Sequence, residues 1–133
     1  MKAMVGMILV LICISLTLQG CLLIAVGAGA GAGAATVAYV RGELKTTYAA
    51  SLDRTWEATL SALRDLRINV YSSKKDATEG NIEATKVDGT KVKIILEPAG
   101  PDTISVRIRV GTFGDEEASR VINRQIASRL GVK

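Results

Sequence analysis

The chain has 133 residues, a formal net charge of +4 and no histidine. This length suits one domain with a small core, and the mild, interspersed charge argues against nucleic acid as a partner. Without histidine, Ser-His-Asp and Cys-His catalysis are excluded, and the commonest metal ligand is missing. No charged residue occurs between Lys2 and Arg41. The charge distribution therefore predicts about forty membrane-directed residues followed by a soluble domain.

The first twenty residues have the pattern of a secretory signal peptide. Lys2 precedes an apolar run from Met4 to Leu16, which is too short to cross a bilayer comfortably. The stretch Leu18–Cys21 then resembles the lipobox of bacterial lipoproteins. That resemblance implies cleavage between Gly20 and Cys21 and a diacylglyceryl (palmitate-type) lipid on Cys21. The alternative is an uncleaved anchor helix with an incidental cysteine.

Residues 21–40 form an uncharged segment rich in Gly and Ala. We favour a spacer, or a segment lying on the membrane surface, because glycine weakens a helix. The alternative is a membrane helix that oligomerises through small residues at every fourth position, Gly27, Gly31 and Ala35. A dinucleotide-binding loop is rejected, because any Gly/Ala alternation matches the G-x-G-x-x-G/A pattern.

The residues from 41 to 133 show the alternating and helical patterns of a folded domain. A short strand over residues 42–49 precedes an amphipathic helix that begins near Ser51 or Asp53 and carries a Leu/Trp stripe. Four further strands are predicted, at residues 68–72, 81–87, 91–97 and 103–110. Asp88-Gly89 marks a hairpin, and Asp115 opens a last helix that ends at Gly131. Its buried stripe is predicted to be Ala118, Val121, Ile122, Ile126 and Leu130.

This order, β-α-β-β-β-β-α, predicts a small two-layer α+β sandwich. An antiparallel sheet of about five strands would carry both helices on one face, and its other face would meet water.

Nearly the whole chain resembles the small bacterial lipoproteins grouped as domain of unknown function 3568. The resemblance is carried by Tyr39–Lys45, by Ser51–Trp56 with the helix after it, and by Val106–Asp115. It implies a lipid-anchored small domain from a diderm bacterium, and it supplies no activity. With Leu22 after the cysteine, the resemblance to sorted lipoproteins points to the outer membrane, with the domain facing the periplasm.

The functional hypothesis is a non-enzymatic binding or scaffolding domain of the cell envelope, with no cofactor besides the lipid on Cys21. Its partners would be membrane lipid and an envelope protein. The alternatives are a membrane-active assembly protein built on the Gly/Ala helix and, less favoured, a carboxylate-dependent enzyme. The carboxylate candidates are Glu79, Glu83, Asp88 and Asp115.

Two surface features are singled out for binding. If their strands pair, Lys91, Lys93, Arg107 and Arg109 form a basic surface that suits anionic lipid or an acidic partner. We favour an ordinary solvated face instead, with Glu83 and Glu97 as cross-strand partners. Phe113 is either an exposed binding tip or, as we prefer, a side chain folded back onto the core.

Overall fold

The computed structural model of the protein describes residues 1, 5–6 and 36–132. The chain divides into two compact units, Met1–Ala32 and Gly33–Lys133, and the second holds the fold. The predicted signal cleavage site, the lipid-bearing Cys21 and the small-residue face of Gly27, Gly31 and Ala35 lie outside the described residues. Within the described ranges, no helix is long and apolar enough to cross a membrane.

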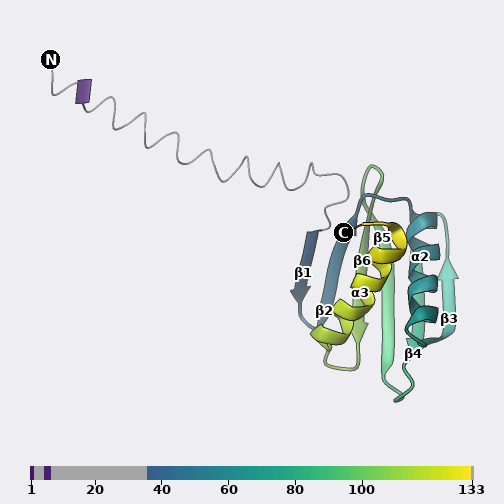
Figure 1. Cartoon of the computed structure of the whole chain (residues 1–133). Coiled ribbons are helices and arrows are strands. Elements are labelled where there is room, and N and C mark those ends of the chain that lie inside the picture. The colour runs from purple at the N-terminus through teal and green to yellow at the C-terminus, as the bar shows by residue number, and fades with distance from the viewer. Residues whose placement is uncertain (2–4, 7–35, 133) are drawn as a thin grey trace. The chain divides into compact units, whose positions relative to one another are not determined.

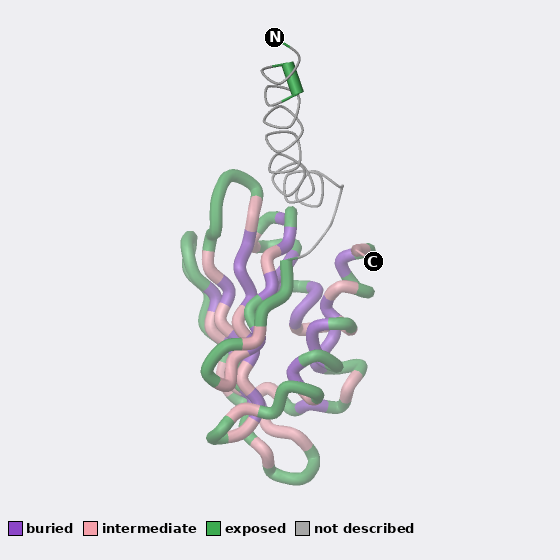
Figure 2. The backbone as a smooth tube through the Cα atoms, turned by 90° about the vertical axis from the view of Figure 1, so that its left-hand side faces the viewer, coloured by how far each residue is buried: buried purple, intermediate pink, exposed green. Residues whose placement is uncertain are grey.

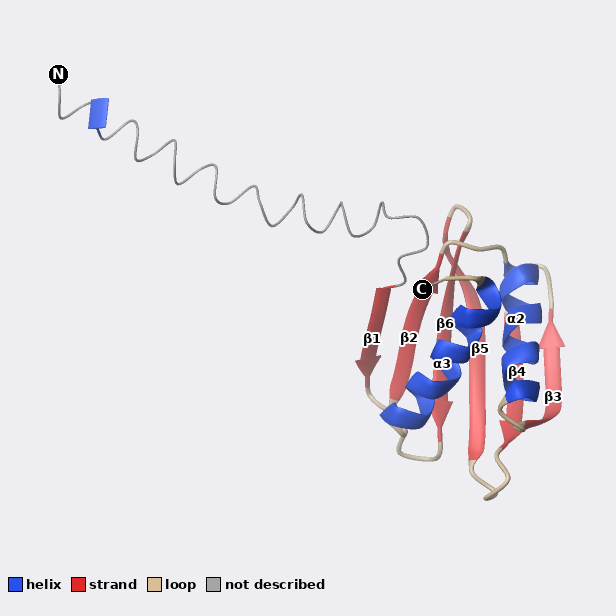
Figure 3. Ribbon diagram, in the orientation of Figure 1, coloured by secondary structure: helices blue, strands red, loops and turns tan. Residues whose placement is uncertain are grey.

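The domain is an antiparallel sheet of six strands with two helices (Figure 1). The strands lie in the order β1-β2-β6-β5-β4-β3. Their bounds are Thr36–Val40 for β1, Glu43–Tyr48 for β2, Asn69–Lys75 for β3, Gly80–Thr85 for β4, Lys91–Gly100 for β5 and Thr103–Val110 for β6. Both helices lie on the same side of the sheet (Figure 3), so the predicted two-layer α+β architecture is confirmed.

Each helix begins at a side-chain cap that the sequence indicates. Helix α2 spans Leu52–Asp65, and the Ser51 hydroxyl accepts a hydrogen bond from the Arg54 backbone N–H at 3.2 Å. Helix α3 spans Glu116–Leu130, and the Asp115 carboxylate accepts from the Ala118 N–H at 3.0 Å. Such caps satisfy backbone donors that have no partner inside the helix. Gly131 ends α3 in the left-handed conformation, as predicted.

The sheet has six strands rather than about five, because residues 36–40 form strand β1. The predicted order is confirmed from β2 onward, and β1 is an additional strand formed by the last residues of the segment predicted to be a Gly/Ala-rich spacer. Val37 lies opposite Thr46, and Tyr39 lies opposite Leu44. Arg41 and Gly42 join the two strands with φ angles of +54° and +83°. Positive φ at both central residues is the geometry of a two-residue hairpin turn whose twist matches its strands.

Two other strands are longer than predicted. Strand β3 runs on to Lys75, into the stretch that the sequence suggests is a loop, and it carries a register shift between Val70 and Ser72. Strand β5 continues through Pro98 to Gly100. The prediction for β6, Thr103–Val110, has the bounds that the structure shows.

The core lies between the helices and the inner face of the sheet. Figure 2 shows the buried backbone where these two layers face each other. Alternate residues of the central strands are completely buried there, among them Leu44, Ile82, Ile94, Val106 and Ile108, together with Leu63 and Ile126 of the helices. Tyr48 is also buried, and its hydroxyl donates to the Asn123 side-chain oxygen at 2.6 Å. This bond ties the end of β2 to α3.

The two ends of the domain have different connections. Thr36, where β1 begins, pairs with Thr47 near the β2–α2 connection, and we call this the entry end. The β1–β2 turn, the β4–β5 loop and the β6–α3 loop lie at the other end, which we call the cleft end (Figure 1).

A candidate binding cleft at one end of the two helices

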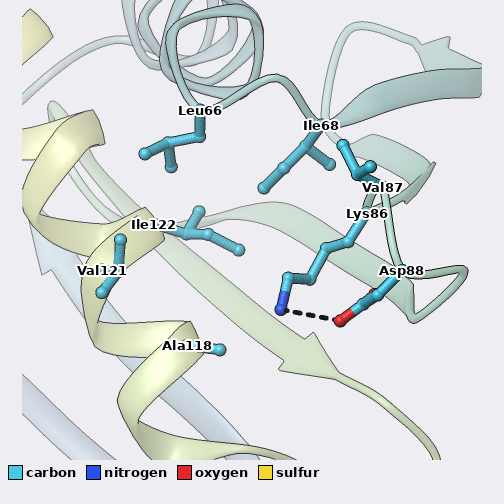
Figure 4. Close-up of a pocket in the computed structure, with 8 residues that line it drawn as sticks. All are labelled: Leu66, Ile68, Lys86, Val87, Asp88, Ala118, Val121 and Ile122. Carbon is cyan, nitrogen blue, oxygen red and sulfur yellow. Dashed lines mark ion pairs between the residues drawn. The ribbon is translucent and has the colours of Figure 1, made fainter.

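An apolar cleft of about 460 Å³ opens at the cleft end, between the two helices and the β4–β5 loop (Figure 4). Its lining residues are Leu66, Ile68, Lys86, Val87, Asp88, Ala118, Val121 and Ile122. Six of these eight side chains are aliphatic. The volume lies within the range of small-molecule sites in proteins, roughly 300–1,000 Å³.

The C-terminal end of α2 positions the residues that this helix contributes to the cleft. Leu66 is its C-cap, and Arg67 then adopts a φ of +57°. The Ile68 N–H donates to the Leu63 carbonyl at 2.9 Å, which closes the last turn while the chain reverses into β3. The side chains of Leu66 and Ile68 consequently reach the cleft instead of continuing the helical stripe (Figure 4).

The facing wall is the hairpin that Asp88-Gly89 predicts. The Lys86 N–H donates to the Thr90 carbonyl at 2.9 Å, and the Asp88 carboxylate accepts from the Thr90 N–H at 2.9 Å. Gly89 supplies the φ of +87° that the turn requires. These bonds fix the loop, and it holds Val87 with 90% of its surface exposed at the edge of the cleft.

The third wall is the N-terminal half of α3, where the sequence-based assignment of the buried face is partly wrong. The helical spacing predicts a buried Val121, but this residue is 37% exposed at the cleft. Ser119 and Asn123 are buried instead, together with Ile122, Ile126 and Leu130. The helix is therefore rotated so that Val121 lies at the margin of the core, where the β4–β5 loop does not cover it.

The only charges in the lining are an ion pair at the edge of the cleft. Lys86 Nζ lies 3.5 Å from Asp88 Oδ2 (Figure 4). Hydrogen bonds from Thr90, and secondarily Lys86, hold the pKa of Asp88 below its ordinary value. The lining thus offers one salt bridge and a large aliphatic surface. Such a site suits an apolar group of a ligand or partner, which would be held by burial of apolar area.

Phe113 lies on the β6–α3 loop at the same end and is 91% exposed, so the preference for a side chain folded onto the core is wrong. The loop is held by backbone contacts with the start of β5 and with the β1–β2 turn. The Gly111 N–H donates to the Lys91 carbonyl at 2.8 Å, and Gly114 packs against Gly42 of the β1–β2 turn. The cleft end therefore presents Phe113 and Val87 on loops that are fixed by their own hydrogen bonds and contacts.

The four predicted basic residues lie on the outer face of the sheet, away from the helices. The register places Lys93 opposite both Arg109 and Glu83. Acidic partners interleave with these cations: Arg107 Nη2 lies 2.8 Å from Glu97 Oε1, and Arg109 Nη1 lies 3.8 Å from Glu43 Oε1. Lys91 Nζ lies 4.8 Å from the centre of the Tyr71 ring. This arrangement matches the solvated face with Glu97 as a partner better than a continuous basic surface.

The four carboxylates considered for catalysis are distributed over the domain. Glu79 precedes β4 at the entry end, Glu83 lies within β4, and Asp88 lies in the loop beyond it. Asp115 caps α3. Among the residues that the structure describes, no group of three or more His, Cys, Asp and Glu residues is arranged to hold a metal ion.

The fold and the cleft define a small α+β domain with one sheet, two helices on one face and an apolar cleft at one end. A family model described as "Protein of unknown function (DUF3568)" matches residues 2–129, and the chain belongs to that family. The match includes Cys21 and the stretch before it as well as the domain. A search of curated proteins gave no match.

Proposed function

We propose that the protein is a lipid-anchored bacterial envelope protein whose domain acts by binding an apolar group of a partner, without catalysis. The main support for the lipid anchor is the stretch Leu18–Cys21, which directly follows an apolar run with a basic start. The resemblance of this stretch to a lipobox supports a diacylglyceryl group on Cys21. Leu22 supports the outer membrane, with the domain in the periplasm.

The position of the cleft supports a binding role. The chain enters the sheet at Thr36, and the cleft lies at the opposite end of the strands. Val87, which lines the cleft, is largely exposed, and Phe113 is exposed on the β6–α3 loop at the same end of the domain. Exposed apolar surface of this kind marks contact sites for other molecules.

Fractionation of cells that produce the full chain tests this proposal. The wild-type protein should separate with the outer membrane. The Cys21→Ser variant should stay with the inner membrane, because an unprocessed signal would still hold it there. Recovery of both proteins in the same fraction, with the same mobility on a gel, would contradict the lipid anchor.

A further inference from the structure

In the described part of the chain, strand β1 is an edge of the sheet, and its own residues include none of the features that usually protect an edge from pairing. No strand in the described part of the chain pairs with its outer side. Its five residues, TVAYV, include no charge and no proline, and its pairing with β2 has no bulge. Val37 is 41% exposed and Val40 is 61% exposed. Such edges are templates for another strand, which is why proteins normally interrupt them with lysine, proline or a bulge.

The other edge of the sheet shows the protection that β1 lacks. Strand β3 carries a register shift between Val70 and Ser72, and it ends in Lys74 and Lys75. The contrast within one sheet indicates that β1 is the edge available for pairing.

The sequence of β1 is complementary to itself. In an antiparallel pair centred on Ala38, each Val37 would lie opposite Tyr39 of the second copy, and each Thr36 opposite Val40. Val37 and Tyr39 share the inner face of the sheet, because their partners in β2, Thr46 and Leu44, are both buried there. Valine beside an aromatic ring is a favourable cross-strand pair. No like charges would meet anywhere along the strand.

We propose that two copies of this protein pair through their β1 strands, antiparallel and centred on Ala38, so that the two sheets become continuous. The pairing goes beyond the proposed function and does not depend on it. Anchorage of both copies to one membrane would favour it by raising their effective concentration. The cleft of each copy would remain open, because it lies between the helices and the β4–β5 loop and not on the β1 edge.

Disulfide trapping in the full-length, membrane-extracted protein tests the register. Residues directly opposite each other in an antiparallel pair have Cα atoms about 4.5–5.5 Å apart, within the range that a disulfide spans. Ala38→Cys should therefore give a cross-linked dimer on mild oxidation. The parent chain is the control, since it reports any disulfide formed through Cys13 or Cys21.

Two variants on the same strand and face are the matched controls. Thr36→Cys alone should give no more cross-linked dimer than the parent chain gives. Its cysteine would lie opposite Val40 of the second copy, far from the cysteine at position 36 of that copy. Thr36→Cys mixed with Val40→Cys should give a dimer. Equal yields from Ala38→Cys and Thr36→Cys would overturn the proposed register.

Charge at the centre of the strand tests the pairing itself, with the Thr36→Cys and Val40→Cys cross-link as the readout. Ala38→Lys in both copies should abolish the dimer, and so should Ala38→Glu in both. One copy of each should restore it. Since Ala38 lies opposite Lys45 in β2, the glutamate suits the fold of its own copy. Loss of the dimer in the Ala38→Glu protein would therefore report lost pairing between the two copies and not misfolding of each copy. Unchanged cross-linking in either single-charge protein would overturn the proposal.

Discussion

Gly42 and Gly114 lie in direct backbone contact, which joins the β1–β2 turn to the β6–α3 loop. A Cβ atom on Gly114 would overlap the Cα and carbonyl oxygen of Gly42, and one on Gly42 would lie 2.7 Å from the Phe113 carbonyl oxygen. Both glycines have φ near +80°. The two stretches that carry the family resemblance, Tyr39–Lys45 and Val106–Asp115, therefore meet at this contact. The contact holds the loop that carries the exposed Phe113.

Substitution of Gly114 tests this close approach. We expect Gly114→Ala to lower the free energy of unfolding through two effects. A left-handed conformation costs an L-residue about 1–2 kcal/mol, and the overlap with Gly42 adds about 1–3 kcal/mol. Urea denaturation measures the sum.

Gly89→Ala is the matched control. Gly89 has a similar φ of +87°, but no atom lies within 4 Å of the position its Cβ would take. It should show only the conformational cost of about 1–2 kcal/mol. If the two variants lost equal stability, the contact between the loops would be contradicted.

Gly80 and Trp56 offer a purely steric test of how α2 packs on the sheet. A Cβ on Gly80 would lie 2.7 Å from the indole ring of Trp56. Gly80→Ala should destabilise the protein by about 1–3 kcal/mol, because the ring must move within a packed core. Trp56 is the only tryptophan, so its fluorescence reports both the displacement and the unfolding midpoint. An unchanged emission spectrum with unchanged stability would contradict this packing.

The Tyr48–Asn123 hydrogen bond predicts a stability change at alkaline pH. Burial raises the pKa of Tyr48 above its ordinary value. Above about pH 10, the unfolded chain loses the tyrosine proton that the folded chain retains. The contribution of Tyr48 to stability is therefore complete below about pH 10 and falls as the pH rises further.

Tyr48→Phe isolates this group from the other titrating side chains. It should lower the free energy of unfolding at neutral pH by about 1–3 kcal/mol, because the buried Asn123 oxygen loses its donor. It should also flatten the decline of stability above about pH 10. Parallel curves of stability against pH for the two proteins would contradict a neutral, buried Tyr48.

Val121 and Ile122 are neighbours on α3 that separate the open cleft from the core. Val121→Ala should cost about 1 kcal/mol or less, because Val121 already meets solvent. Ile122→Ala should cost about 2–5 kcal/mol, since Ile122 is 2% exposed. Urea midpoints of the two variants check this contrast. Equal losses would mean that Val121 lies inside the core, as its helical spacing alone predicts.

The parts of the fold that follow local rules could be predicted from the sequence. Alternation fixed β6, the Asp88-Gly89 pair located its hairpin, and the caps at Ser51 and Asp115 located both helices. Each of these signals acts between residues close in the chain. Strand β1 escaped prediction because its uncharged residues continue the Gly/Ala-rich tract, and because Arg41 is an unusual residue for a turn with positive φ.

The cleft could not be predicted from the sequence, because it depends on how the two helices and the β4–β5 loop pack against one another. Val121 and Ile122 both fit the apolar stripe of α3, and only the packing of the helix against the rest of the domain decides which of them remains exposed. Phe113 likewise lies on a loop that contacts Gly42, a residue far away in the sequence. The pairing of the strands that carry Lys93 and Arg109 could be predicted, since it follows from hairpin order.

The intact mass of the membrane-extracted protein tests the central claim most directly. The lipid-anchor account predicts a chain that lacks residues 1–20 and carries the added mass of acyl chains on Cys21. Both changes should be absent from the Cys21→Ser variant. A full-length, unmodified wild-type chain would contradict the account, and the first forty residues would then have to hold the domain at the membrane without a lipid.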